Sequence, residues 1–373
     1  MQYKSICRIP GKTGLFEILY ENSRIEKLEP LPAGGTGREA VWVSPGLFDI
    51  QLNGMIGHSL SAKGLTEDNV REIDTELEKH GILFWCPTLT TQDPLIIEEN
   101  LRVVKRVIEE EGASNIVCIH LEGHYISSEE GYAGAHMPRF IRDPDSREFD
   151  RWQKLAGGTI RLFSLAPERK GALEFIRKLR SEGVKVGLVH HHADHERVMA
   201  AAAAGADLSS HLLNGCAPLI HRQHNVIWSQ LSLDELWASF IADGHHIPHY
   251  TLRALIKAKG MNRSIITSDL VYLSGLPDGE YVKNENTVVL KDGGLWIKDR
   301  DILSGAVKTL DQQVEYLASH SGFSIEEALV MASLNPARYF GLEDRMQMYQ
   351  GRCGKLAVFS WKSNTLTVEK ILK

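Results

Sequence analysis

The amino-acid sequence predicts an α/β fold, a TIM-type (β/α)8 barrel with a small β-sandwich domain formed from both chain ends. Eight short apolar runs recur through the middle of the chain, and helical patterns separate many of them. That alternation is typical of parallel strands covered by helices. Strand-like segments with glycine and proline turns occupy the two ends. We therefore expect residues 1–45 and 346–373 to form the small domain and residues 46–345 to form the barrel.

The eight predicted barrel strands are short apolar runs that mostly end in polar residues. They span residues 47–53, 82–89, 116–122, 160–166, 184–190, 208–212, 237–243 and 264–269. Helices are predicted between several of them, over residues 66–80, 93–112, 195–204 and 248–259. Asp93 and Pro94 form a preferred helix start, and Gly112 is expected to end that helix.

The chain after the eighth strand contains further regular structure. Residues 286–299 are predicted to form a β-hairpin, because Asp292-Gly293 is a strong two-residue turn signal. A helix is predicted over residues 324–333, followed by Asn335-Pro336. Residues 355–373 resemble strands again, so we expect them to join the N-terminal strands.

The composition is that of a soluble globular enzyme. The 373 residues are 43% hydrophobic and 24% charged, and no apolar run approaches the roughly 18 residues of a membrane span. The net charge of -6 argues against nucleic-acid binding, although a local Arg or His pocket can still bind a small anion. The five cysteines form no C-x-x-C pair, and the N-terminus lacks the apolar core of a signal peptide. We therefore expect a cytoplasmic protein.

Acidic residues and histidines stand at the carboxyl ends of five predicted strands. The third strand ends in HLEG and the fifth in VHHH, the sixth carries SSHLLN, the seventh ends in ADGHH and the eighth in TSD. The residues delivered there are Glu122, His190, His211, Asp243 and Asp269. In a TIM barrel these ends meet on one face, which is where the active site lies.

Three of these residues are suited to bind a catalytic metal ion. Glu122, His190 and His211 offer one carboxylate and two imidazoles, a set that leaves a zinc ion one position for water. A bound cation lowers the pKa of water and polarises a carbonyl oxygen. Asp269 is then placed to accept the proton of the water and to pass it to a leaving amine. Each residue alone is more often a cap or a solvated side chain, but their joint placement favours a metal-dependent hydrolase.

Nine segments of the chain match one enzyme family, in the family order. They are PGLFDIQLNG (45–54), PTL (87–89), HLEG (120–123), GAH (134–136), HLLNG (211–215), IADGHH (241–246), GLPDGEY (275–281), LSGA (303–306) and NPAR (335–338). His190 and His211 are also 21 positions apart, which is the family's spacing between two histidine ligands. The chain therefore resembles the N-acetylglucosamine-6-phosphate deacetylases of the amidohydrolase superfamily.

The resemblance implies metal-dependent removal of the acetyl group of N-acetylglucosamine 6-phosphate, which gives glucosamine 6-phosphate and acetate. It implies metal ligands at Glu122, His190 and His211 and a catalytic acid/base at Asp269. Many amidohydrolases bind a second ion through an H-x-H motif, but Gln51-Leu52-Asn53 occupies that place here. We therefore expect one divalent ion per chain, with zinc as the first choice and iron, manganese or cobalt as the others.

The resemblance also implies a set of substrate contacts. They are Ala135, His136, Asn214, Gly215, Arg222, Asp243, His246, Leu303, Ser304 and Gly305. His136 is in addition expected to polarise the acetyl carbonyl, and we count it with Asp269 as catalytic. Arg222 is expected to bind the phosphate in the active site of a neighbouring subunit, which implies a homodimer.

The chain departs from the family pattern mainly around the substrate contacts. His124 stands where the family usually has proline, His191 and His192 replace a serine and an asparagine, and Arg222 is followed by Gln-His-Asn. A related amidohydrolase acting on another N-acyl amino sugar, an N-acyl amino acid or a cyclic amide therefore stays open. An inactive scaffold barrel is the alternative from another class. Arg222 and His246 favour a phosphorylated substrate, and stoichiometric metal would argue against a scaffold.

Overall fold

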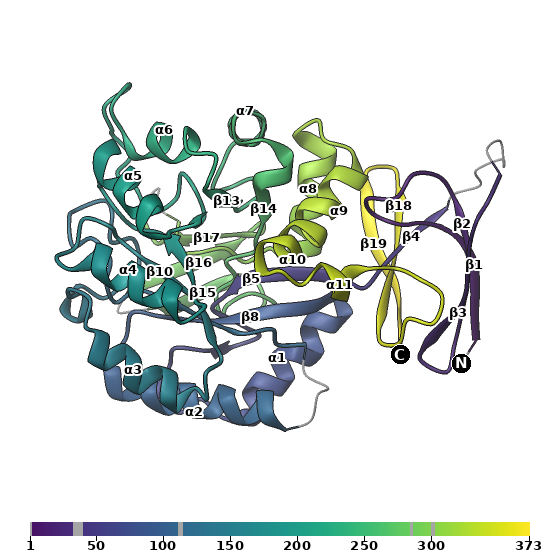
Figure 1. The fold of residues 1–373 in the computed structure, drawn as a ribbon, viewed down its shortest axis with the longest axis horizontal. Coiled ribbons are helices and arrows are strands. Elements are labelled where there is room, and N and C mark those ends of the chain that lie inside the picture. The colour runs from purple at the N-terminus through teal and green to yellow at the C-terminus, as the bar shows by residue number, and fades with distance from the viewer. Residues whose placement is uncertain (1, 33–39, 111–114, 284–285, 300–302) are drawn as a thin grey trace.

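Eight parallel strands form the central sheet, in the order β14-β13-β12-β11-β10-β9-β8-β5. Figure 1 shows its strands β5, β8, β10, β13 and β14 surrounded by helices. The computed structural model describes residues 2–32, 40–110, 115–283, 286–299 and 303–373. The strands are β5 (Leu47–Leu52), β8 (Ile82–Thr90), β9 (Ile119–Glu122), β10 (Ile160–Leu165), β11 (Lys185–Leu188), β12 (Leu208–Ser209), β13 (Trp237–Phe240) and β14 (Ser264–Ile266). Asp269 N donates to Gln51 O at 3.0 Å, and Leu52 forms a parallel β-bridge with Leu270. These contacts nearly close the sheet, so the predicted barrel is confirmed.

The last four barrel strands end two or three residues before their predicted ends. For β11, β12 and β14 the cause is the backbone conformation of the polar residues that follow. His190, His211 and Asp269 have φ angles of 46°, 31° and 51°. This left-handed region interrupts a strand, and non-glycine residues held there concentrate at functional sites. The three side chains therefore stand on turns that leave the barrel rather than within its strands.

The predicted helices between the strands are present. α1 (Glu67–Lys79) begins at a capping box formed by Thr66, and α2 (Pro94–Glu109) begins at Asp93. Gly112, the predicted end of α2, lies outside the described residues. The other helices between barrel strands are α3 (Ser146–Leu155), α4 (Ala172–Ser181), α5 (His195–Ala204), α6 (Val226–Leu231) and α7 (His249–Lys259). Their apolar faces share one large core with the strands.

In the described part of the chain, four helices follow the eighth strand. They are α8 (Leu310–His320), α9 (Ile325–Met331), α10 (Leu334–Phe340) and α11 (Glu343–Met346). Asn335-Pro336 does not begin a loop after α9. Both residues lie in α10, because proline is compatible with the first turn of a helix. Asn335 Nδ2 donates to the carbonyls of Met261 and Ser264 at 2.8 and 2.7 Å, which attaches α10 to the barrel. Among the described residues, no helix has the length and apolarity that a membrane span requires.

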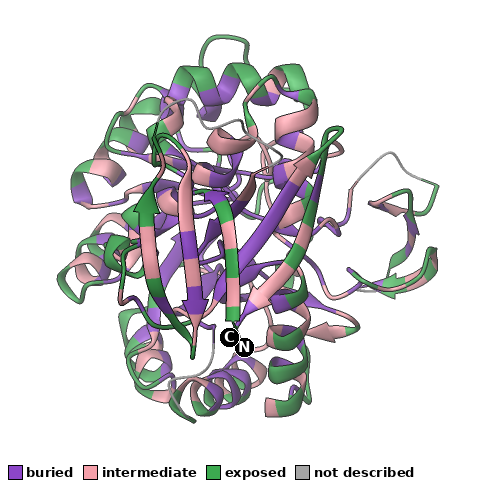
Figure 2. Ribbon diagram, turned by 90° about the vertical axis from the view of Figure 1, so that its right-hand side faces the viewer, coloured by how far each residue is buried: buried purple, intermediate pink, exposed green. Residues whose placement is uncertain are grey.

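Both chain ends form one six-stranded sheet, in the order β19-β18-β4-β1-β2-β3. Its strands are β1 (Gln2–Arg8), β2 (Phe16–Glu21), β3 (Arg24–Pro30), β4 (Val41–Ser44), β18 (Leu356–Lys362) and β19 (Thr365–Leu372). Figure 2 shows this sheet in front of the barrel, with the two termini next to each other. Ile18, Val43 and Val358 belong to a core cluster separate from that of the barrel. The expected β unit from both ends is thus one continuous sheet with a core of its own.

A three-stranded sheet follows β14 and lies beside the barrel mouth. It consists of β15 (Gly279–Lys283), β16 (Asn286–Lys291) and β17 (Gly294–Ile297). Asp292 and Gly293 both have positive φ, 51° and 72°, as the tight turn of a hairpin requires, so the predicted β-hairpin is confirmed. Trp296 forms an antiparallel β-bridge with Leu303. This contact brings the segment after Leu303 to the open end of the barrel.

Candidate active site

A cavity of about 600 Å³ opens at the carboxyl ends of the barrel strands. Most of the site residues predicted from the sequence line it. They are Glu122, Ala135, His136, His190, His211, Asn214, Gly215, His246, Asp269, Leu303 and Gly305. Residues from the third, fifth, sixth, seventh and eighth strand ends thus meet around one space, as their positions in the barrel predict.

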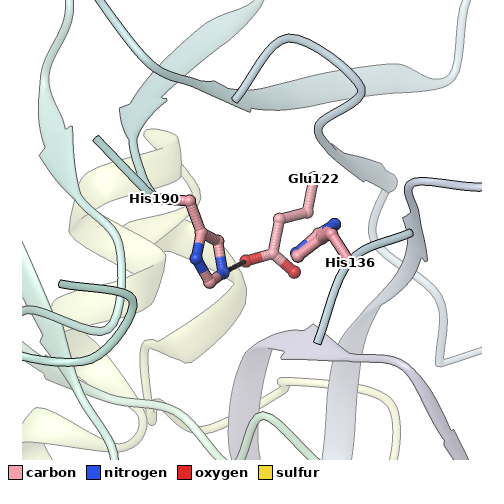
Figure 3. Close-up of side chains that lie close together, drawn as sticks. All are labelled: Glu122, His136 and His190. Atoms are coloured by element: carbon pink, nitrogen blue, oxygen red, sulfur yellow. Dashed lines mark ion pairs between the residues drawn. The ribbon is translucent and has the colours of Figure 1, made fainter. Parts of the chain in front are cut away.

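A carboxylate and three histidines gather at one side of this cavity. One ligand atom each from Glu122, His136 and His190 lies within 4.8 Å of the other two (Figure 3). His211 reaches the same group through Glu122, because its Nε2 lies 2.9 Å from Glu122 Oε1. His190 Nε2 lies 3.6 Å from that oxygen. The structure therefore brings the three predicted metal ligands together and adds His136 as a fourth donor.

The hydrogen bonds of His190 prepare it for metal binding. Its Nδ1 lies 2.7 Å from the carbonyl oxygen of Tyr132. Because a carbonyl only accepts, Nδ1 carries the proton and Nε2 is free to coordinate a metal ion. Two glycines enclose the ring: a Cβ on Gly134 or Gly215 would lie 2.7 or 2.5 Å from it. The donor set and its orientation therefore fit a divalent ion of the kind that imidazole and carboxylate bind.

Burial and mutual contact set the protonation states of these groups. Burial opposes ionisation of Glu122, but the neighbouring His190 and His211 hold the pKa of Glu122 well below its usual value. Burial alone would lower the pKa of His211, yet the Glu122 carboxylate raises it to about 9. Burial, with the neighbouring His190, lowers the pKa of His136 to about 3. His136 is therefore a neutral imidazole at physiological pH.

Asp269 faces the cluster from the end of the eighth strand. Gln51 Nε2 and Asn53 Nδ2 both donate to its Oδ1, at 3.0 and 2.7 Å. Oδ2 has no hydrogen bond to any described residue, so it stays available to the cavity. Burial raises the pKa of Asp269, although His211 and Asn53 oppose the shift. The two amides that replace an H-x-H pair thus orient the carboxylate that the sequence assigned to proton transfer.

The seventh strand supplies an oriented histidine at another part of the cavity wall. His246 Nδ1 lies 2.7 Å from Asp243 Oδ2, and Asp243 Oδ1 accepts from the backbone N–H groups of His245 and His246. Asp243 itself is buried and does not line the cavity. Asn214 contributes a buried Nδ2 without a protein partner. A polar side chain left unpaired at a cavity wall is suited to a ligand oxygen.

Besides Asp243, two predicted substrate residues, Arg222 and Ser304, do not line the cavity. Arg222 is exposed on the loop before α6, outside the cavity of its own chain. Ser304 is buried, and both its carbonyl oxygen and its Oγ contact Lys283 Nζ. Lys283 lines the cavity but was not predicted from the sequence. The only signal for it would have been its place in β15, where the alternation of burial turns Lys283 inward.

This barrel, with a carboxylate–imidazole cluster and a buried aspartate at its mouth, defines a hydrolase of the amidohydrolase superfamily, whose members depend on metal ions. No family model matches the chain. It is 30% identical to the N-acetylgalactosamine-6-phosphate deacetylase of Escherichia coli O157:H7 over 86% of its length and 83% of the relative. It is also 30% identical to the N-acetylglucosamine-6-phosphate deacetylase of Danio rerio, over 81% of its length and 76% of the relative.

A solved structure agrees with these sequence relatives. A mutant of N-acetyl-D-glucosamine-6-phosphate deacetylase from Mycobacterium smegmatis, in complex with N-acetyl-D-glucosamine 6-phosphate, is 25% identical to the chain with a TM-score of 0.86. The match covers 99% of this chain and 98% of that one. The chain belongs to the N-acetylglucosamine-6-phosphate deacetylase family. It is a hydrolase that acts on an N-acetyl amide.

Proposed function

We propose that the chain deacetylates N-acetylglucosamine 6-phosphate to glucosamine 6-phosphate and acetate. The observation that carries the proposal is the meeting of Glu122, His190, His211 and Asp269 around one cavity in a chain of this family. N-acetylgalactosamine 6-phosphate is the second candidate substrate, because the Escherichia coli relative is named for it. The two sugars differ only in the configuration of one hydroxyl, so the same catalytic residues serve either.

We assign the metal ligands to Glu122, His190 and His211 and propose a single zinc ion. Bound there, a divalent ion would activate water and polarise the acetyl carbonyl. His136 stands beside His190, with ring centroids 4.6 Å apart. Its Nδ1 lies 2.8 Å from Thr91 Oγ1. With the Thr91 hydroxyl donating to Nδ1, the proton of neutral His136 is on Nε2, which donates to the acetyl oxygen.

Asp269 carries the proton through the reaction. Its Oδ1 is held by Gln51 and Asn53, so Oδ2 is the atom that accepts a proton from the attacking water. The water oxygen bonds to the acetyl carbon, the C–N bond breaks, and Asp269 returns the proton to the leaving nitrogen. The products are acetate and the free amine. Its raised pKa makes Asp269 a better proton acceptor than an exposed aspartate.

The substrate contacts predicted from the sequence become proposals on the cavity wall. Ala135, Leu303 and Gly305 line the sugar, and Asn214, Gly215 and His246 bind its polar groups. Asp243 acts through His246, and Ser304 acts through Lys283. Arg222 completes the phosphate site of the partner in a homodimer. The exposed Leu219 and Trp228 near Arg222 support an interface there, because large apolar side chains at a surface favour association.

Two further assignments follow the same proposal. Residues 1–45 and 346–373 form a unit distinct from the barrel of residues 46–345, which the separate core of the six-stranded sheet supports. The enzyme acts in the cytoplasm. All five cysteines are free, and the thiols of Cys86 and Cys118 lie 3.5 Å apart, which suits a reducing compartment.

The direct test is a coupled assay of amine release. The panel contains N-acetylglucosamine, N-acetylgalactosamine and N-acetylmannosamine, each with and without a 6-phosphate. The proposal expects the highest kcat/KM for N-acetylglucosamine 6-phosphate. Preference for an unphosphorylated sugar would refute it, and an inert protein without stoichiometric metal would support the scaffold alternative.

A further inference from the structure

Lys283 is a buried cation on the cavity wall for which the deacetylation chemistry has no role. It is the last residue of β15, its exposure is 8%, and it lines the cavity together with Asp269, Leu303 and Gly305. Lysine is almost never so buried unless it is paired with an opposite charge. Its surroundings therefore indicate what kind of ligand it can bind.

The ammonium group has only part of its hydrogen-bonding capacity used. Nζ donates to Ser304 O at 2.6 Å and lies 3.3 Å from Ser304 Oγ. An ammonium has three N–H donors, so one is left. No carboxylate in the described part of the chain forms an ion pair with Lys283. Burial lowers the pKa of Lys283 to about 8, and the more distant Asp269 only partly offsets this.

The position of Lys283 is fixed by the sheet that carries it. β15 pairs with β16, and β16 with β17, through regular antiparallel registers. Ser304 N donates to Leu295 O on β17 at 2.8 Å, so the residue that holds Nζ is itself anchored. Tyr272, another cavity residue, donates its hydroxyl to the carbonyl of Val282 at 2.9 Å. The charge is therefore presented to the cavity by rigid structure rather than by a flexible arm.

We propose that Lys283 binds the phosphate of the substrate within its own chain. The inference rests on the proposed function, in which the phosphate is the anionic group of the sugar. A neutral hydroxyl could accept the third N–H but would leave the buried charge uncompensated, which costs several kcal/mol. A phosphate compensates the charge and accepts the hydrogen bond together, and lysine is a common phosphate ligand. Arg222 contributes from the partner, whereas Lys283 belongs to the site itself.

Two other roles for Lys283 give different outcomes. As a purely structural anchor of the segment around Ser304, its loss would lower stability and would affect every substrate equally. As a modulator of Asp269, its loss would shift the pH profile for phosphorylated and unphosphorylated sugars alike. As a phosphate ligand, its loss affects the phosphorylated sugar selectively and leaves the substrate-free protein at least as stable, since an unpaired buried charge is removed.

The experiment compares Lys283→Met with Lys291→Met. Methionine keeps the length and apolar stem of lysine, and Lys291 is an exposed lysine of the same three-stranded sheet, on β16. We expect Lys283→Met to lower kcat/KM for N-acetylglucosamine 6-phosphate by roughly 10–150-fold, since hydrogen bonds to charged groups are worth about 1.5–3 kcal/mol. Activity on N-acetylglucosamine should fall far less, and Lys291→Met should change neither. Equal losses on both sugars would overturn the proposal.

A binding measurement separates this inference from the proposed function. Inorganic phosphate and glucosamine 6-phosphate should raise the Tm of the wild-type protein and of Lys291→Met, and should raise that of Lys283→Met much less at the same ligand concentration. If the wild-type enzyme deacetylates no phosphorylated sugar, the proposed function fails, while a phosphate-dependent Tm shift that is much smaller in Lys283→Met still supports the site. If Lys283→Met keeps the full Tm shift, Lys283 is not the phosphate ligand, whatever the substrate.

Discussion

Asn53 donates a 2.7 Å hydrogen bond from Nδ2 to Oδ1 of Asp269, across the junction between the first and last strands of the barrel. Gln51 donates to the same oxygen at 3.0 Å. Both amides therefore fix the same oxygen of the carboxylate and leave the other oxygen facing the cavity. This gives a physical reason for amides at a position where many amidohydrolases bind a second metal ion.

Replacing Asn53 by alanine should impair proton transfer without emptying the metal site. The hydrogen bond from Asn53 favours the ionised form of Asp269, and burial opposes that form. Without the bond, the pKa of Asp269 rises further. Only the ionised carboxylate accepts a proton, so activity is lost as the pH falls through this pKa, and the acidic limb of the kcat profile should move to higher pH.

The size of the Asn53→Ala effect follows from the strength of such bonds. Hydrogen bonds to charged groups are worth about 1.5–3 kcal/mol, so kcat below the shifted pKa should fall by roughly tenfold or more. Metal content, measured by elemental analysis on the same samples, serves as the control. A lower kcat with an unmoved acidic limb would mean that Asn53 positions the substrate rather than Asp269.

Replacing Asp269 by asparagine should keep the fold and the metal ion but remove most turnover. An amide cannot accept the proton of water, and general acid–base catalysis is typically worth roughly 10²–10⁴-fold. Asn53 and Gln51 can still donate to the remaining carbonyl oxygen, so the local structure should persist. Near-normal turnover of a metal-loaded Asp269→Asn protein would exclude Asp269 as the acid/base.

Metal analysis of histidine variants should separate ligands from neighbours. We expect one divalent ion per chain in the wild-type protein, and its loss in His190→Ala and His211→Ala. His136→Ala should keep the ion and lose turnover, because His136 is proposed to donate to the acetyl oxygen. The geometry also groups His136 with Glu122 and His190, so metal lost in His136→Ala and His190→Ala but kept in His211→Ala would reassign the third ligand to His136. Two tightly bound ions would refute the single-metal proposal.

The sequence predicts the barrel well because apolar strand runs and helix caps are local signals. All eight strands form, and α1 and α2 begin at the caps found in the sequence. The sequence could not predict where the later strands end. The left-handed backbone at His190 and Asp269 arises from the tertiary structure of the site rather than from residue propensity. The local sequence at Asn335-Pro336 is likewise compatible with a loop or with the first turn of a helix. The hydrogen bonds of Asn335 to two barrel carbonyls favour the helix.

The sequence could place a residue in the cavity where a chemically suitable side chain stands at the end of a predicted barrel strand. Glu122 and Asp269 satisfy both conditions, and the structure brings them to one cavity. Lys283 satisfies neither, because a lysine in an alternating strand outside the barrel looks like a solvent-facing residue. Its burial depends on a contact with Ser304, 21 residues away, which no local pattern encodes. Ser304, which was expected at the substrate, accepts a hydrogen bond from this lysine.

Arg222 should act on the phosphate across the dimer, so Arg222→Ala should impair the phosphorylated substrate selectively. Guanidinium–phosphate contacts are charge-assisted and worth about 1.5–3 kcal/mol, which corresponds to roughly 10–150-fold in kcat/KM. Binding energy from the phosphate also positions the distant acetyl group, so kcat should fall together with affinity. Activity on the unphosphorylated sugar should hardly change. Equal losses on both sugars would mean that Arg222 supports structure, and a fully active monomer would refute the dimer.

The origin of Arg222 can be tested by mixing two impaired proteins. One carries Asp269→Asn and the other carries Arg222→Ala, and they are co-refolded or co-expressed so that subunits exchange. In a mixed dimer, the Arg222→Ala subunit keeps its own Asp269 and receives Arg222 from the Asp269→Asn subunit, so one complete site forms. Activity on N-acetylglucosamine 6-phosphate should therefore exceed the mean of the two parents. If Arg222 served the cavity of its own chain, mixing would create no complete site. Activity would then stay at the parental mean, and the position of Arg222 outside its own cavity would need a structural explanation.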